Sequence, residues 1–178
     1  TRRVIRLWNQ CIGQVPGWPS RPLAQLPRPH QGWTLPMSAF PQSLRDDIAR
    51  WAAQVAGDDL SAEDAIDRPL DASTIRTRLH HIRMMASALV RKGHAIDNVT
   101  GLDYLVQVDN FKAAMDYIYR SRGAKPSEYL QGIAGSMQAI ARHYVKLPEA
   151  NIEQRAKTRK RVGPARKQRG MTAKGRAR

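Results

Sequence analysis

The pattern of apolar and polar residues changes at about residue 43. From there on, apolar residues recur every three or four positions, as on the buried side of an α-helix. Before it, seven of the eleven prolines fall between Pro16 and Pro41, and proline fixes φ and removes a backbone donor. We therefore expect an extended, Pro/Trp-rich N-terminal arm over 1–42, a helical body over 43–148 and a basic tail over 149–178.

The helical part carries start and stop signals for several helices. One segment begins at Ser43 and ends near Gly57. The longest begins at Asp71 or Ser73, has an apolar side from Ile75 to Val90, and stops at Gly93. The remaining segments are a short helical turn at 102–106, helices at 109–123 and 126–148, and a last helix from Pro148 to the break at Gly163 and Pro164.

No run of alternating β-branched residues is bounded by hairpin turns. We therefore expect an all-α fold, with four or five helices around one core. Within the helix at 126–148, Gly132 and Gly135 are unfavourable for an isolated helix and indicate close helix–helix approach. The aromatic residues of the arm favour packing on the helical body over stacking on bases, because buried area dominates aromatic energetics. They are Trp8, Trp18, Trp33 and Phe40.

The net charge of +15 over 178 residues is unevenly distributed. Residues 1–45 carry +6, residues 46–150 carry −1, and residues 151–178 carry +10. Basic ends on a near-neutral body are typical of a protein that binds a polyanion, because Lys and Arg release counterions from phosphates. Nucleic acid is the leading candidate, and the alternative is a solvated tail.

No apolar stretch approaches the roughly 20 residues needed to span a bilayer, and no secretory leader is recognisable. We therefore expect no membrane partner and an intracellular, cytoplasmic location. Cys11, the single cysteine, cannot form an internal disulfide or supply a thiolate zinc site alone.

Catalytic motifs are absent from the sequence: there is no phosphate-binding Gly-rich loop, nucleophile elbow or His-Glu-x-x-His motif. The histidines have no Cys or carboxylate partner at metal-ligand spacing. Tyr117 and Tyr119 lack the arginine cluster and general acid that phosphoryl transfer would need. We therefore expect no catalytic residue, no metal and no cofactor in this chain, which is interpreted as a binding module.

The long helix from residue 73 carries a basic stripe. Arg76, His80 and Arg83 stand at i, i+4 and i+7, beside the apolar stripe. An arginine on such a face could read guanine O6 and N7 in the major groove, and the alternative is an ordinary solvated face. The other predicted DNA-binding residues are expected to position phosphates. They are Arg78, Arg91, Lys92, Arg120, Arg122, Lys125, Arg142, Lys146, Arg159, Lys160, Arg161, Arg166 and Lys167.

Several stretches resemble a known family. Residues 73–93, followed by Gly-Leu-x-x-Leu-Val at 101–106, are similar to the core-binding domain of tyrosine site-specific recombinases, the phage-integrase family. Residues 129–147 are similar to the next helix of integrases from bacterial mobile elements. The arm from Trp18 to Leu44 and the ending at 170–178 also fit such proteins.

The resemblance implies a SAM-like core-binding bundle that clamps duplex DNA at a recombination or attachment site during DNA integration. Partner protomers would join it on DNA, and a separate domain would cleave the strands. None of that domain's Arg, Lys, His and Tyr set maps onto this sequence, so we expect an N-terminal fragment that is not itself an enzyme. The alternatives are a basic helical RNA-binding protein and a protein-interaction adaptor.

Overall fold

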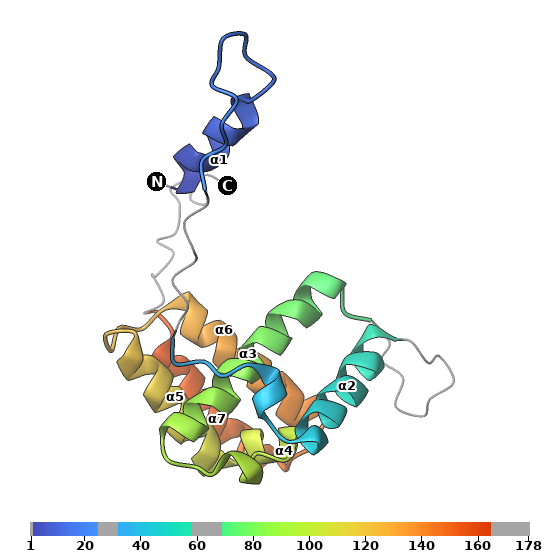
Figure 1. Cartoon of the computed structure of the whole chain (residues 1–178). Coiled ribbons are helices and arrows are strands. Elements are labelled where there is room, and N and C mark those ends of the chain that lie inside the picture. Colours follow the sequence, from blue (N-terminus) through green and yellow to red (C-terminus); the bar gives the residue numbers. More distant parts are fainter. Residues whose placement is uncertain (1, 25–31, 58–68, 165–178) are drawn as a thin grey trace, which may run out of the picture. The chain divides into compact units, whose positions relative to one another are not determined.

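The computed structural model describes residues 2–24, 32–57 and 69–164. Every regular element in these ranges is helical, so the all-α class is confirmed (Figure 1). The expected four or five helices were too few, because the described residues contain seven α-helices. They are α1 (Arg2–Cys11), α2 (Gln42–Ala56), α3 (Ala72–Arg91), α4 (Leu102–Val106), α5 (Val108–Ser121), α6 (Glu128–His143) and α7 (Glu149–Val162), with 3-10 turns at Met37–Ala39 and Ile96–Asn98.

Local signals set most helix ends. Gly57 ends α2 with φ of 74°, a left-handed conformation that glycine adopts without strain. Asp71 begins α3 by accepting hydrogen bonds from the backbone N–H groups of Ser73 and Thr74. The position predicted for the start of α5 was wrong by two residues, because Gln107, not Asp109, precedes its first turn.

The described chain forms two compact units, divided between Gly32 and Trp33 instead of at residue 42. In the first unit α1 packs against the segment that returns after it. Trp8 and Trp18 lie with ring centroids 4.8 Å apart, and the Asn9 side chain both donates to and accepts from the Leu23 backbone. A wholly extended arm was therefore a wrong prediction, because no proline precedes residue 16 and the first eleven residues are free to become helical.

Residues 33–42 belong to the second unit and pack on its helices. The Trp33 ring meets Tyr117 edge-on at 5.4 Å, the Leu35 N–H donates to Ser87 Oγ at 3.0 Å, and Phe40 is 2% exposed. The prediction that the aromatics pack on the helical body is thus confirmed for Trp33 and Phe40. Trp8 and Trp18 instead contact each other.

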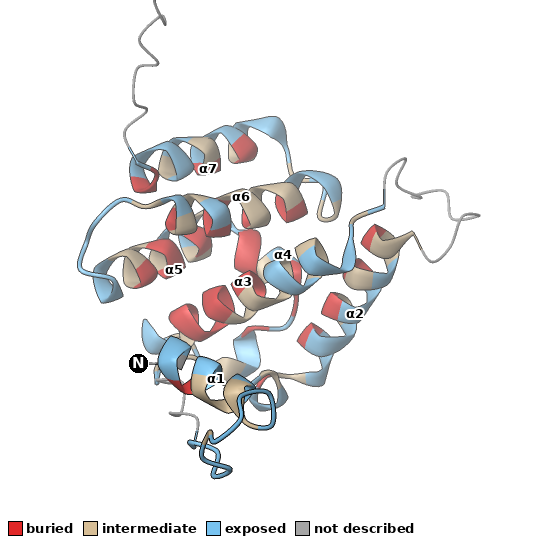
Figure 2. Ribbon diagram, turned by 90° about the horizontal axis from the view of Figure 1, so that it is seen from above, coloured by how far each residue is buried: buried red, intermediate tan, exposed pale blue. Residues whose placement is uncertain are grey.

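Helix α3 lies at the centre of the second unit, in contact with α2, α4, α5 and α6 (Figure 2). From His81 to Leu89 every residue but Arg83 is buried. Helix α7 packs on α5 and α6, so residues 149–162 form part of this body and not a linker.

Asp47 joins three helices of the body. Its carboxylate accepts hydrogen bonds from the Leu102 N–H of α4 at 2.7 Å and from the Tyr144 hydroxyl, just after α6, at 2.7 Å. Arg50, on its own helix, is 3.0 Å away. Gly101 has no side chain with which to cap α4, so a carboxylate from α2 does so. Burial alone would raise the pKa of Asp47, but these hydrogen bonds outweigh it and lower the pKa below 3.8.

Replacing Asp47 with Ala is expected to lower the free energy of unfolding by about 2 kcal/mol, because two partly buried donors lose a charged acceptor. Because the folded-state pKa is lowered, this contribution is present above pH 3.8 and disappears as the pH falls through the folded-state value. Urea unfolding at neutral and acid pH measures both effects. If D47A lowers the free energy of unfolding by the same amount at neutral and at acid pH, the charge of the Asp47 carboxylate does not contribute to stability as stated.

Candidate nucleic-acid interface

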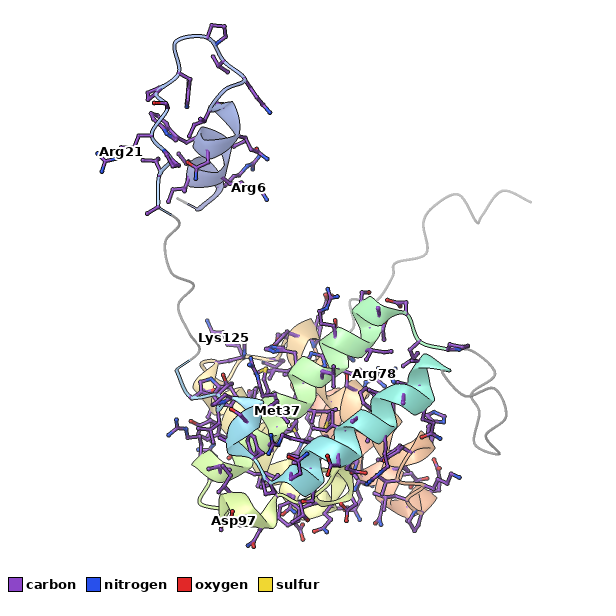
Figure 3. The ribbon with its side chains drawn as sticks, turned by 45° about the vertical axis from the view of Figure 1, so that its right-hand side comes forward. Arg6, Arg21, Met37, Arg78, Asp97 and Lys125 are labelled. Atoms are coloured by element: carbon purple, nitrogen blue, oxygen red, sulfur yellow. The ribbon has the colours of Figure 1, made fainter. Side chains whose placement is uncertain are left out.

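The N-terminal half of α3 lies at the surface. Arg76 is exposed, while Arg78, His80 and Arg83 are half-buried. Helical geometry places His80 and Arg83 on the same flank as Arg76, and Arg78 on the other flank beside His81. The predicted basic stripe therefore exists, but α6 covers part of it, and only the first two turns of α3 protrude from the core. Figure 3 labels Arg78 on this half of α3.

His80, Arg83, Arg122 and Tyr129 gather on one flank of α3, and we call them the Tyr129 cluster. Arg122 lies 4.2 Å above the Tyr129 ring, in a cation–π arrangement. The Tyr129 hydroxyl is 3.1 Å from His80 Nε2. Burial lowers the pKa of His80, and the charges of Arg83 and Arg122 lower it further. At neutral pH the positive charge of the cluster is therefore that of Arg83 and Arg122, and within the described residues no carboxylate pairs with either of them.

An open cleft of about 410 Å³ lies on the other flank, along one face of α6, and we call it the α6 cleft. Arg78 of α3 and Arg159 of α7 stand on its two sides. The α6 residues that line it are Glu128, Gln131, Gly132, Gly135 and Ser136.

His81 lies beside the α6 cleft and bonds to its lining. Its Nδ1 is 2.8 Å from Ser136 Oγ, and its side chain is the nearest neighbour that a Cβ at Gly132 would meet, at 3.9 Å. Burial, together with the charges of His80 and Arg78, lowers the pKa of His81 to about 4. His81 is therefore uncharged at neutral pH.

The close helix–helix approach that the sequence predicts at the glycines of α6 is seen at Gly135, against which Arg159 of α7 lies, and not at Gly132. Gly132 is exposed, and a Cβ there would have room. Gly135 faces the guanidinium of Arg159, which a Cβ would meet at 3.4 Å. Because neither glycine has a side chain, the α6 cleft extends down to the helix backbone, and the Arg159 guanidinium lies against Gly135.

Other predicted DNA-binding residues are held in ion pairs. Lys92 and Arg120 both bind Asp116, each at 2.8 Å, and Arg142 binds Glu149 at 2.7 Å. Asp116 is shared by two cations and Glu149 pairs with one, so these two carboxylates offset two of the three positive charges. The Arg91 Nε donates to the Trp33 carbonyl at 3.0 Å, so it holds residues 33–42 against α3.

The remaining predicted residues are scattered over the surface. Lys125 is exposed in the turn between α5 and α6 (Figure 3), and Lys146 has a left-handed φ of 56° after α6. Lys160 and Arg161 are exposed on α7. Arg166 and Lys167 lie outside the described residues.

Arg155 differs from the other basic residues of α7 because it is only 1% exposed. Its Nη1 donates to the Asn151 carbonyl, whereas Nε and Nη2 have no partner among the described residues. Burial lowers the pKa of its guanidinium. Arg155 belongs to the segment 149–178, which was expected to form a basic tail. The packing of α7 on α5 and α6 instead turns its side chain inward.

The sequence did not indicate that Tyr129 and Ser136 bond to His80 and His81. It also did not indicate that Arg78 and Arg159 line the same cleft. The helical period gave the faces of α3 and α6, but it did not indicate which face of one meets which face of the other.

A scan against protein-family models, a search of curated proteins and a search of solved structures returned no match to this chain. The described ranges contain no group of three or more His, Cys, Asp or Glu residues placed to hold a metal ion. Among the same residues, no helix has the length and apolar character needed to cross a bilayer.

The lowered pKa of His81 makes stability depend on pH. Between its unfolded value of 6.5 and about 4 in the folded state, only the unfolded chain binds this proton. The free energy of unfolding should therefore fall as the pH drops from 6.5 to 4, by at most about 1.4 kcal/mol per pH unit. Urea titrations of the wild type and His81→Gln test this, and equal pH slopes for the two proteins would contradict it.

Arg155→Met should raise the free energy of unfolding by about 1–2 kcal/mol. Methionine keeps the apolar stem but removes a buried charge that lacks a carboxylate partner among the described residues. Arg161→Met, at an exposed position of the same helix, is the matched control and should change stability by under about 0.5 kcal/mol. A destabilised R155M protein would show that the guanidinium contributes to the fold.

Proposed function

We propose that this chain binds duplex DNA through basic residues on both flanks of the contact between α3 and α6. The observation that carries the proposal is the Tyr129 cluster. There, Arg83 and Arg122 both lie close enough to His80 to lower its pKa, and neither has a carboxylate partner among the described residues, whereas Lys92, Arg120 and Arg142 are ion-paired. Like charges held together repel one another, so such an arrangement favours a polyanionic partner.

Duplex DNA is the polyanion that the arrangement supports best. The basic groups project from packed helices, which suits the regular spacing of phosphates on a duplex. One face of the Tyr129 ring lies under the Arg122 guanidinium, and the His81 ring meets Tyr129 edge-on at 5.9 Å, so the ring is a poor platform for stacking an unpaired base. This favours duplex DNA over single-stranded RNA.

The resemblance of residues 73–93 and 129–147 to tyrosine recombinases agrees with this proposal. In that reading the bundle around α3 is a SAM-like core-binding domain that clamps DNA at a recombination site, and residues outside this chain perform strand cleavage. The exposed first two turns of α3, with Arg76, are then the part of the helix that reaches a groove. The buried remainder holds them in place.

The double variant R83Q/R122Q tests the proposal. If each arginine neutralises one phosphate, the slope of log K against log salt should fall by about 2, because each phosphate contact contributes roughly 0.9. Affinity for any duplex should weaken at low salt. Fluorescence anisotropy with a labelled duplex measures both quantities.

R142Q is the matched control, since it removes one charge that Glu149 already offsets. It should leave the slope nearly unchanged. Circular dichroism must first show that all variants keep their helix content. A slope that falls no more in R83Q/R122Q than in R142Q would overturn the proposal, as would tighter binding of single-stranded RNA than of duplex DNA.

A further inference from the structure

We propose that the α6 cleft is a binding site for a phosphate group, held between Arg78 of α3 and Arg159 of α7. The inference rests on the proposed function for the source of that phosphate, which is the DNA backbone. It goes further by assigning the phosphate to one cleft and to named donors.

The cleft combines two cations from different helices. Both arginines line it, and neither forms an ion pair within the described residues. Burial lowers the pKa of Arg78, with no opposing effect of a carboxylate. Arg159 reaches only the neutral amide oxygen of Gln138, at 3.4 Å. Arg78 is half-buried, and a half-buried cation without a counter-charge is costly, so an anion in the cleft would offset that cost. Arg159 is exposed and adds a second positive charge to the same cleft.

Neutral donors complete the cleft. The Gln131 side-chain amide and the Ser136 hydroxyl both line it. When His81 carries its proton on Nδ1, it donates to Ser136 Oγ, and the serine hydrogen is then free to bond to a phosphate oxygen. Two arginines with a hydroxyl and an amide match the acceptor oxygens of a phosphate group.

The shape of the cleft depends on its glycines. Gly132 lies mid-helix and exposed, where alanine would be the better helix former, and a Cβ there would meet only His81, at 3.9 Å. Packing therefore does not require this glycine. Its effect is to leave open space above the helix backbone, between Arg78 and Arg159.

Glu128 is the feature that opposes an anion. It lines the cleft in the first turn of α6, and within the described residues no ion pair joins it to Arg78 or Arg159. Its charge should repel a phosphate, so Glu128→Gln should tighten phosphate binding. A merely structural role for the two arginines would not produce that gain.

The first measurement is an NMR titration of the full chain with inorganic phosphate. The backbone amide signals of Gly132 and Gly135 should shift and saturate. Arg78→Gln and Arg159→Gln should each weaken binding about tenfold, since each removes a charge-assisted hydrogen bond. Arg45→Gln, at an exposed position of α2, removes the same charge elsewhere and should leave the affinity unchanged.

Gly132→Ala keeps the proposal falsifiable even if an arginine variant folds poorly. Alanine should raise the melting temperature, because it favours the helix, while its methyl group narrows the cleft. A more stable protein that binds phosphate at least about threefold more weakly, about 0.7 kcal/mol at 25 °C, is the expected result. If G132A gains stability and binds phosphate as well as the wild type, the site is not the one proposed.

The second measurement repeats the series with a labelled duplex. Weaker DNA binding by R78Q and R159Q than by R45Q identifies the DNA backbone as the source of the phosphate. If these variants lose inorganic phosphate but bind DNA as R45Q does, the cleft takes a free phosphate compound, and the DNA source is overturned.

Failure of this inference is distinguishable from failure of the proposed function. If inorganic phosphate shifts neither glycine amide, and R78Q and R159Q bind duplex DNA as R45Q does, the inference is wrong. The salt slope of the wild type and of R83Q/R122Q then still decides whether the chain binds DNA.

Discussion

The burial of the second half of α3 is the constraint on which the rest of the body depends. Met84, Met85, Ala86 and Ser87 are fully buried, and four consecutive residues point in all directions around one helix. A helix that is apolar on all sides must be covered on all sides, and α2, α4, α5 and α6 provide that cover. The first half of α3 carries charge and cannot enter the core, so the helix runs from the surface into the interior.

Because of this arrangement, the histidine and arginine side chains of the candidate interface lie where α3 leaves the core. His80 and His81 both contact α6: His80 bonds to Tyr129, whereas His81 bonds to Ser136 and meets the edge of the Tyr129 ring. The arginines next to them are thereby divided into two groups. Arg83 joins the Tyr129 cluster, whereas Arg78 lines the α6 cleft. The neutral state of His81 lets a polar ring lie between these groups without adding a further buried charge.

Helix α7 completes the second group. Its packing on α5 and α6 brings Arg159 over Gly135 and turns Arg155 inward. A strongly basic helix is therefore used in several ways, because one residue is buried, one borders a cleft and others face solvent. Elsewhere on the body, Asp116 and Glu149 offset nearby basic residues. Among the described residues, Arg78, Arg83, Arg122 and Arg159 lie near α6 without a carboxylate partner.

The sequence by itself determined the helical class and most helix ends, because caps such as Asp71 and stops such as Gly57 act through neighbouring backbone groups. It also gave the basic stripe on α3, since helical period fixes which side chains share a face. It missed α1, whose partners Trp18, Arg21 and Leu23 lie within the proline-rich stretch that follows. Only the tertiary structure decided that Asp47 caps α4, that Arg155 is buried and that Arg78 and Arg159 line the same cleft. These features join residues far apart in the chain and depend on how the helices pack.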